Sequence, residues 1–117
     1  MPFKFEKLIV WQKAVDLSEL VDTIAKSFPT PELYILTSQI KRAADSVSLN
    51  IAEGSTGQTN AEFKRFLNIA LRSAIEVVGC IYLAQRRKII AQENFISIYK
   101  SCEEILVMIN ALKNSLK

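Results

Sequence analysis

The sequence contains no histidine and only two cysteines, Cys80 and Cys102. Imidazole and thiolate are the usual zinc ligands, and histidine is the most frequent general acid or base in enzymes. The chain also lacks a GxSxG nucleophile elbow and a phosphate-binding glycine loop, so we expect no enzyme, no catalytic residue, no metal and no cofactor. Cys102 lies in an apolar helical pattern, which predicts a buried, reduced thiol.

Glycine and proline are equally scarce, with three of each, and every proline lies before residue 32. Few helix-breaking residues argue against a loop-rich fold, and no segment shows sustained strand-like alternation. Half of the 117 residues are apolar, which is enough for one packed core. The sequence therefore predicts an all-α chain with a single domain over residues 1–117.

The chain also has little excess charge and no long apolar run. Fifteen basic and twelve acidic residues give a net charge of +3, which permits contact with a polyanion without requiring it. No signal sequence opens the chain, and no uninterrupted apolar run reaches the roughly 18 residues of a membrane span. We therefore expect a cytoplasmic protein with no membrane partner.

Four segments carry apolar residues at every third or fourth position, the spacing of one helix face. The expected helices cover about residues 8–27, 31–54, 60–88 and 92–116. Prolines separate the first two helices, and Gly54 is expected to end the second in a left-handed conformation. Thr59 and Glu62 fit a capping box at the start of the third helix. Short connections between these helices predict an antiparallel, up-down four-helix bundle.

Two apolar patches exceed what the core of a monomeric bundle requires. They comprise Leu71, Ile75, Val78 and Tyr82 on the third helix, and Leu8, Trp11 and Val15 on the first. Neighbouring helices and residues 3–5 could cover both patches. The alternative is a subunit interface, because large exposed apolar patches are uncommon on monomers. We favour self-association.

A polar ridge runs beside the apolar stripe of the second helix, away from its solvent face. It comprises Gln39, Arg42, Ser46, Asn50 and Glu53, and the last four lie within about 60° of Gln39 in helical projection. The ridge is either a partly solvated stripe between core and surface, or a hydrogen-bonded network at a helix or subunit contact. Arg42 and Glu53 are three turns apart and cannot pair, so each needs another partner if buried. Glu76 is a candidate partner for Arg42, and Asn50 could fix the helix register.

Basic residues of the third helix are the candidates for nucleic-acid binding. They are Lys64, Arg65, Arg72, Arg86, Arg87 and Lys88. Arg65 and Arg72 share the face opposite Phe63. These charges are either ordinary solvated groups or phosphate contacts, and phosphate contacts would give poor sequence specificity and strong salt dependence. A competing hypothesis is an adaptor oligomer that holds a protein partner through Trp11 and Tyr82.

Three segments carry a family resemblance: LIVWQKA, SFPTPELYILTSQIKRAADSVSLNIAEG and EFKRFLNIALRSAIEV. They resemble the small four-helix-bundle proteins encoded within intervening sequences of bacterial large-subunit ribosomal RNA genes, relatives of the accessory variability protein of diversity-generating retroelements. The resemblance covers nearly the whole chain. It implies a homo-oligomeric ring, usually a pentamer, and RNA or DNA binding. The retroelement relatives add a reverse transcriptase and its template RNA as candidate partners.

Two positions depart from the pattern of this family. Gly57 and Gln58 stand where many relatives carry arginine, so a basic contact to phosphate is lost from this loop or moved elsewhere. Arg72 stands where relatives tend to have glycine before the serine of the third helix. Either the helix packing is looser here, or Arg72 replaces a loop arginine as an outer charge.

Overall fold

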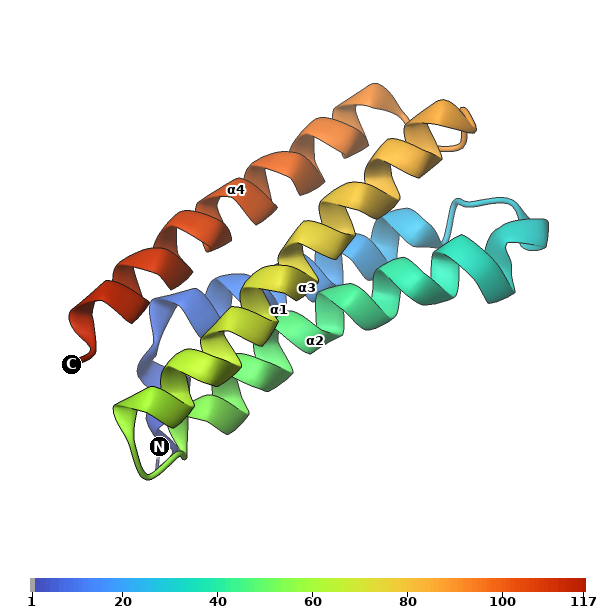
Figure 1. The fold of residues 1–117 in the computed structure, drawn as a ribbon. Coiled ribbons are helices and arrows are strands. Elements are labelled where there is room, and N and C mark those ends of the chain that lie inside the picture. The colour runs from blue at the N-terminus through green and yellow to red at the C-terminus, as the bar shows by residue number, and fades with distance from the viewer. Residues whose placement is uncertain (1) are drawn as a thin grey trace.

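The computed structural model describes residues 2–117, which form four α-helices and no strand (Figure 1). The helices are α1 (Ile9–Ala25), α2 (Ser38–Ser55), α3 (Asn60–Arg86) and α4 (Gln92–Ser115). They run alternately up and down, and the packed pairs are α1 with α2, α2 with α3, α3 with α4, and α4 with α1. The sequence prediction of four helices in a bundle is confirmed.

The buried side chains form one hydrophobic cluster to which every helix contributes. Leu17, Ile51, Leu67 and Ile105 are fully enclosed, and each occupies a position that the helical spacing assigns to the core. Cys102 is also buried and free, as predicted. The periodicity of the sequence therefore identifies the inward face of all four helices.

The second helix begins differently from the prediction. A 3₁₀ turn at Thr30–Glu32 and a π-helical turn at Leu33–Thr37 precede α2, where regular α-helix was expected from residue 31. Prolines 29 and 31 lack backbone donors, so the chain enters the helix through irregular turns before i to i−4 hydrogen bonding is established. This entry leaves Tyr34 and Ile35 exposed at one end of the bundle.

Gly54 does not end α2 through a left-handed conformation, so that prediction is wrong. No glycine in the described chain has positive φ, and Gly54 is buried inside the last turn of the helix. A Cβ atom added there would lie 2.5 Å from the Cβ of Phe66 on α3. Gly54 is therefore required for the close approach of α2 and α3.

The left-handed residue of the described chain is Lys88, with φ of 59°, immediately beyond α3. The amide of Ile89 donates to the carbonyl of Ala84 at 3.0 Å, a bond typical of a Schellman-type helix end. At the other end of α3, the amide of Glu62 donates to the Thr59 hydroxyl at 3.1 Å. The predicted Thr59 cap is thus present.

The N-terminal residues cover the apolar patch on α1. The Phe5 ring packs edge-to-face against the Trp11 indole, with ring centroids 4.8 Å apart. Leu8 and Trp11 are half-buried against the core. Of the two sequence alternatives, coverage within the chain is therefore correct for this patch. The patch on α3 is different, because Ile75 and Tyr82 remain exposed.

The α3 helix is more apolar than expected from the lack of a long uninterrupted apolar run. By length and composition its most apolar window of 18 residues could cross a membrane. Of that window, 39% is buried within the bundle, and a single helix of this kind is weak evidence for a membrane span because core helices pass the same test.

The two helical glycines provide a matched test of this packing. Gly54→Ala should destabilise the fold by about 1–3 kcal/mol, because its methyl group would overlap Phe66. Gly79→Ala should stabilise it by about 1 kcal/mol, because no atom lies near the added methyl and alanine favours the helix. Urea unfolding measures both, and equal effects of the same sign would contradict the packing described here.

Candidate nucleic-acid interface

A hydrogen-bonded network links α2 to α3 at the centre of their contact. Asn50 Nδ2 donates to the Ser46 carbonyl at 2.8 Å and to Ser46 Oγ at 2.9 Å. Ser73 Oγ on α3 lies 2.9 Å from Ser46 Oγ and 3.0 Å from the Ile69 carbonyl. Each hydroxyl has one proton, so all contacts are satisfied when donation runs from Asn50 through Ser46 and Ser73 to Ile69.

The network includes Ser46 and Asn50 of the predicted polar ridge, whereas other residues of the ridge lie outside it. Gln39 Nε2 donates to Glu76 Oε2 at 3.3 Å, so the partner of Glu76 is Gln39. Arg42 and Glu53 are exposed, and neither belongs to the ion pairs found within residues 2–117. The suggested Arg42–Glu76 pair is not formed, because these two side chains lie at the exposed edge of the α2–α3 contact, where water can solvate them.

Ser73 is the member of this network that the sequence analysis did not single out. It is a buried hydroxyl within the inward-facing set of α3, between Ala70 and Val77. A serine at a core position of an apolar helix signals a polar partner on the neighbouring helix. That signal was available in the sequence beside Arg72.

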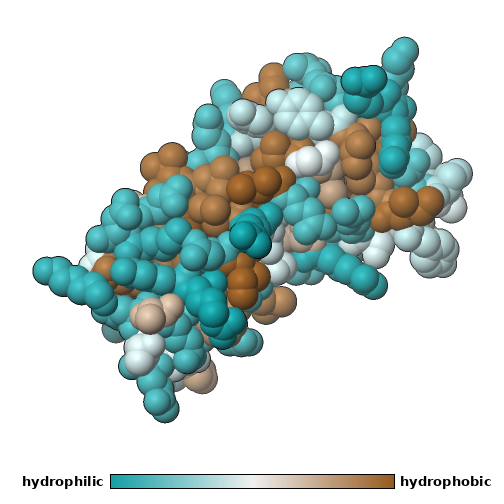
Figure 2. Space-filling view, viewed as in Figure 1, coloured by the Kyte–Doolittle hydropathy of each residue, from teal (hydrophilic) through white to brown (hydrophobic). Residues whose placement is uncertain are grey.

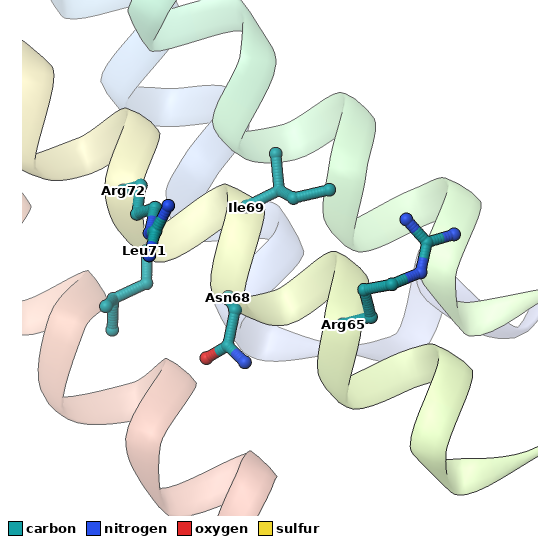
Figure 3. Close-up of a pocket in the computed structure, with 5 residues that line it drawn as sticks. All are labelled: Arg65, Asn68, Ile69, Leu71 and Arg72. Atoms are coloured by element: carbon teal, nitrogen blue, oxygen red, sulfur yellow. The ribbon is translucent and has the colours of Figure 1, made fainter.

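Arg65 and Arg72 stand at the two ends of an open cleft on the outer surface of α3. The cleft has a volume of about 470 Å³ and is lined by Arg65, Asn68, Ile69, Leu71 and Arg72. Figure 3 shows Arg65 and Ile69 on the side of α2, and Leu71 on the side of α4. Two turns of helix separate the arginines by about 10.5 Å along the axis. We call this surface the arginine cleft.

No carboxylate of the described residues pairs with the two guanidinium groups of the arginine cleft. Neither arginine belongs to the ion pairs formed among residues 2–117. The Arg65 guanidinium lies over the Phe66 ring, 4.5 Å from its centroid, which orients the side chain without neutralising its charge. Planar, unpaired guanidinium groups are well suited to bidentate contact with phosphate.

The six predicted basic residues do not form one surface. Lys64 is half-buried next to Arg65, whereas Arg86, Arg87 and Lys88 lie at the opposite end of α3, about 30 Å away along the helix. Arg87 Nη1 is 3.0 Å from Glu32 Oε1, so its charge is paired. Two groups of exposed basic residues therefore remain as candidates for phosphate binding. One is the arginine cleft, and the other is Arg86 with Lys88 at the far end of the helix.

Lysines on the α1–α2 side are occupied by an acidic partner. Lys41 Nζ is 3.1 Å from Asp22 Oδ1, and Lys26 Nζ is 3.3 Å from Asp22 Oδ2. Hydrogen bonds from Lys41 and then Lys26 hold the pKa of the Asp22 carboxyl below its usual value. These cations are therefore poorer candidates for phosphate than those of the arginine cleft.

Neither Cys80 nor Cys102 is suited to act as a nucleophile at neutral pH, because both thiols are buried. Burial raises the pKa of Cys102 to about 12, and burial with the nearby Glu76 charge raises the pKa of Cys80 to about 11. Both thiols are therefore protonated and weakly nucleophilic at pH 7. Within residues 2–117, no group of three or more cysteine, aspartate or glutamate side chains is arranged to hold a metal ion.

Comparison with known proteins agrees with this fold. Residues 6–111 match the family model described as 23S rRNA-intervening sequence protein. The chain is 28% identical to a Bacteroides thetaiotaomicron protein of unknown function from the S23 ribosomal protein family, whose crystal structure superimposes with a TM-score of 0.82. That match covers 90% of this chain and 98% of the other. No curated protein matches the chain.

The serine network predicts a specific pattern of stability changes. Ser73→Ala should destabilise the fold by about 1–3 kcal/mol, because the Ser46 hydroxyl loses a buried partner. Adding Ser46→Ala to Ser73→Ala should cost less than the sum of the two single changes. Ser97→Ala is the matched control, because within residues 2–117 that hydroxyl bonds only the exposed Glu93 carbonyl of its own helix. Strictly additive costs in urea unfolding would contradict the network.

Proposed function

Because this chain belongs to the 23S rRNA-intervening sequence protein family, we propose that it is a homo-oligomeric, non-catalytic protein that contacts nucleic acid without sequence specificity. The observation that carries the proposal is the arginine cleft. It presents two unpaired guanidinium groups on one exposed helix face, with the Asn68 amide between them. The relevant compartment is the cytoplasm, where such an RNA or DNA partner is present.

The chemistry of the arginine cleft favours phosphate over a base edge. Its arginines project from the outer surface of one helix, with about 10.5 Å between them along the axis, so both can meet one extended backbone. Contacts to phosphate position a protein but carry no direct sequence information. The proposed binding therefore follows the charge and shape of the nucleic acid.

Self-association supplies the affinity that one chain lacks. A net charge of +3 gives one copy only weak electrostatic attraction to a polyanion. Five copies would carry about +15 and present five arginine clefts, and linked weak sites gain strongly in apparent affinity. The exposed apolar side chains of α2, α3 and α4 support such an assembly, because monomers rarely expose large patches of this kind.

Arg86 and Lys88 extend the proposed surface toward the opposite end of α3. Both are exposed, and neither belongs to the ion pairs of the described residues. They lie too far from Arg65 to contact the same phosphate, so they would meet a different part of a long backbone. Arg87 contributes less, because Glu32 already pairs with it.

An adaptor that binds a protein partner is the second candidate function. Its predicted anchors were Trp11 and Tyr82. Trp11 is half-buried and packs against Phe5, which leaves only part of its indole accessible. Tyr82 is exposed and rests edge-on against Phe95, so the α3–α4 face is the surface that favours this alternative.

Charge reversal of the arginine cleft tests the proposal directly. We expect Arg65→Glu/Arg72→Glu to weaken binding of a fluorescent RNA hairpin by about tenfold or more at 50 mM salt, and to flatten its salt dependence. Fluorescence anisotropy at 50 and 200 mM salt measures both quantities.

The control for this experiment is Lys7→Glu/Lys100→Glu, which changes the net charge equally at exposed residues outside α3. This variant should retain most of the affinity of the unmodified protein. Absence of RNA binding at 50 mM salt, or equal losses in both double variants, would refute the proposed role of the arginine cleft.

A further inference from the structure

The outer surface between α3 and α4 forms an apolar groove with one carboxylate. The groove has a volume of about 210 Å³ and is lined by Ile75, Val78, Tyr99, Glu103 and Leu106. Figure 2, viewed as Figure 1, shows hydrophobic surface along this seam, interrupted by hydrophilic side chains. Ile75 is 51% exposed although it belongs to the apolar stripe of α3. We call this surface the α3/α4 groove.

Glu103 gives the α3/α4 groove an unbalanced negative charge. Its neighbour Glu104 faces α1 and pairs with Lys13 at 3.2 Å, whereas Glu103 belongs to no ion pair among the described residues. A carboxylate in an apolar groove is costly to cover unless the covering surface brings a cation. The surface that fits this groove is therefore apolar with one positive charge.

Such a surface exists on α2 and the π-helical turn before it in the same chain. Arg42 and Leu49 lie seven residues, or about two helical turns, apart on α2, and Ile35 lies seven residues before Arg42 in the π-helical turn that leads into α2. Ile35 is 62% and Leu49 is 65% exposed, and Arg42 between them has no ion-pair partner within residues 2–117. We call these three side chains the outer row of α2.

We infer that the outer row of α2 from one copy packs into the α3/α4 groove of the next copy, with Arg42 opposite Glu103. The outer row presents the positive charge of Arg42 between exposed Ile35 and Leu49, with Lys41 and Asp45 beside it, and the groove presents the negative charge of Glu103. Large aliphatic side chains of the row would fill the space between Ile75 and Leu106. The arrangement provides Arg42 with an ion-pair partner, which residues 2–117 of its own chain do not supply.

The contact must be between copies, because α2 and α4 are the diagonal pair of the bundle. The packed pairs join each of them to α1 and α3. Arg42 and Glu103 therefore cannot meet within one chain. Two different surfaces also make the contact heterologous, the type that generates a ring when the rotation closes. This inference rests on the self-association proposed above and names the residues that meet.

Charge exchange tests the contact, with assembly mass measured by sedimentation velocity over a dilution series. Arg42→Glu alone and Glu103→Arg alone should each raise the concentration at which assembly is half complete by about tenfold or more, because like charges would face each other. The double variant Arg42→Glu/Glu103→Arg should recover assembly to within a few-fold of the unmodified chain.

Glu104→Arg is the matched control, since it makes the same charge change one residue away on the α1 side of α4. It should leave assembly unchanged, and circular dichroism of every variant verifies the fold. Rescue by the double variant, with a silent control, supports the contact.

Two results would overturn the contact while leaving self-association intact: an assembled wild type that is insensitive to both single reversals, or single defects that the double variant does not repair. A wild type that stays at 13.2 kDa throughout would overturn self-association as well, and would leave the α3/α4 groove to a helix of another protein. RNA affinity is measured separately, so neither failure is confused with failure of the arginine cleft.

Discussion

The close contact of α2 with α3 determines which surfaces of this protein face outward. Gly54 allows the backbones to approach at one end, where any larger residue would meet Phe66. Ser46 and Ser73 join the two helices near the middle, and Gln39 with Glu76 closes the other end. Because small and polar residues fill this contact, the larger apolar and charged residues of both helices lie to either side of it.

The candidate surfaces are a consequence of that contact. On α2, the helix face beyond Ser46 carries Arg42 and Leu49 into solvent. On α3, the face opposite the core carries Arg65 and Arg72, which are exposed. Both pairs of side chains are therefore held outward by the same packing, which links the proposed assembly surface to the proposed phosphate surface.

The inward half of the structure was predictable from the sequence. Apolar spacing identified the four helices and their core positions, since one periodic stripe must be buried whatever the partner. Local backbone geometry was less predictable. Gly54 was expected to end a helix, but glycine serves both turns and close approaches, and only the position of Phe66 distinguishes the two.

The candidate site was predictable only in its composition. The sequence named six basic residues on or just after α3, but it could not show that Glu32, distant in the chain, neutralises Arg87. It also named Ser46 and Asn50 without Ser73, because a hydrogen bond between helices depends on their relative register. Ion pairs and hydrogen bonds between helices depend on how the helices pack, so the residue pattern of one helix cannot predict them.

Exposed apolar side chains on α2, α3 and α4 are the basis of the claim that further copies cover these surfaces. Sedimentation equilibrium of the unmodified chain tests that claim most directly. The account predicts a particle with a mass that is a multiple of 13.2 kDa, about 66 kDa for a ring of five. A homogeneous 13.2 kDa particle that persists at the highest attainable concentration would contradict it.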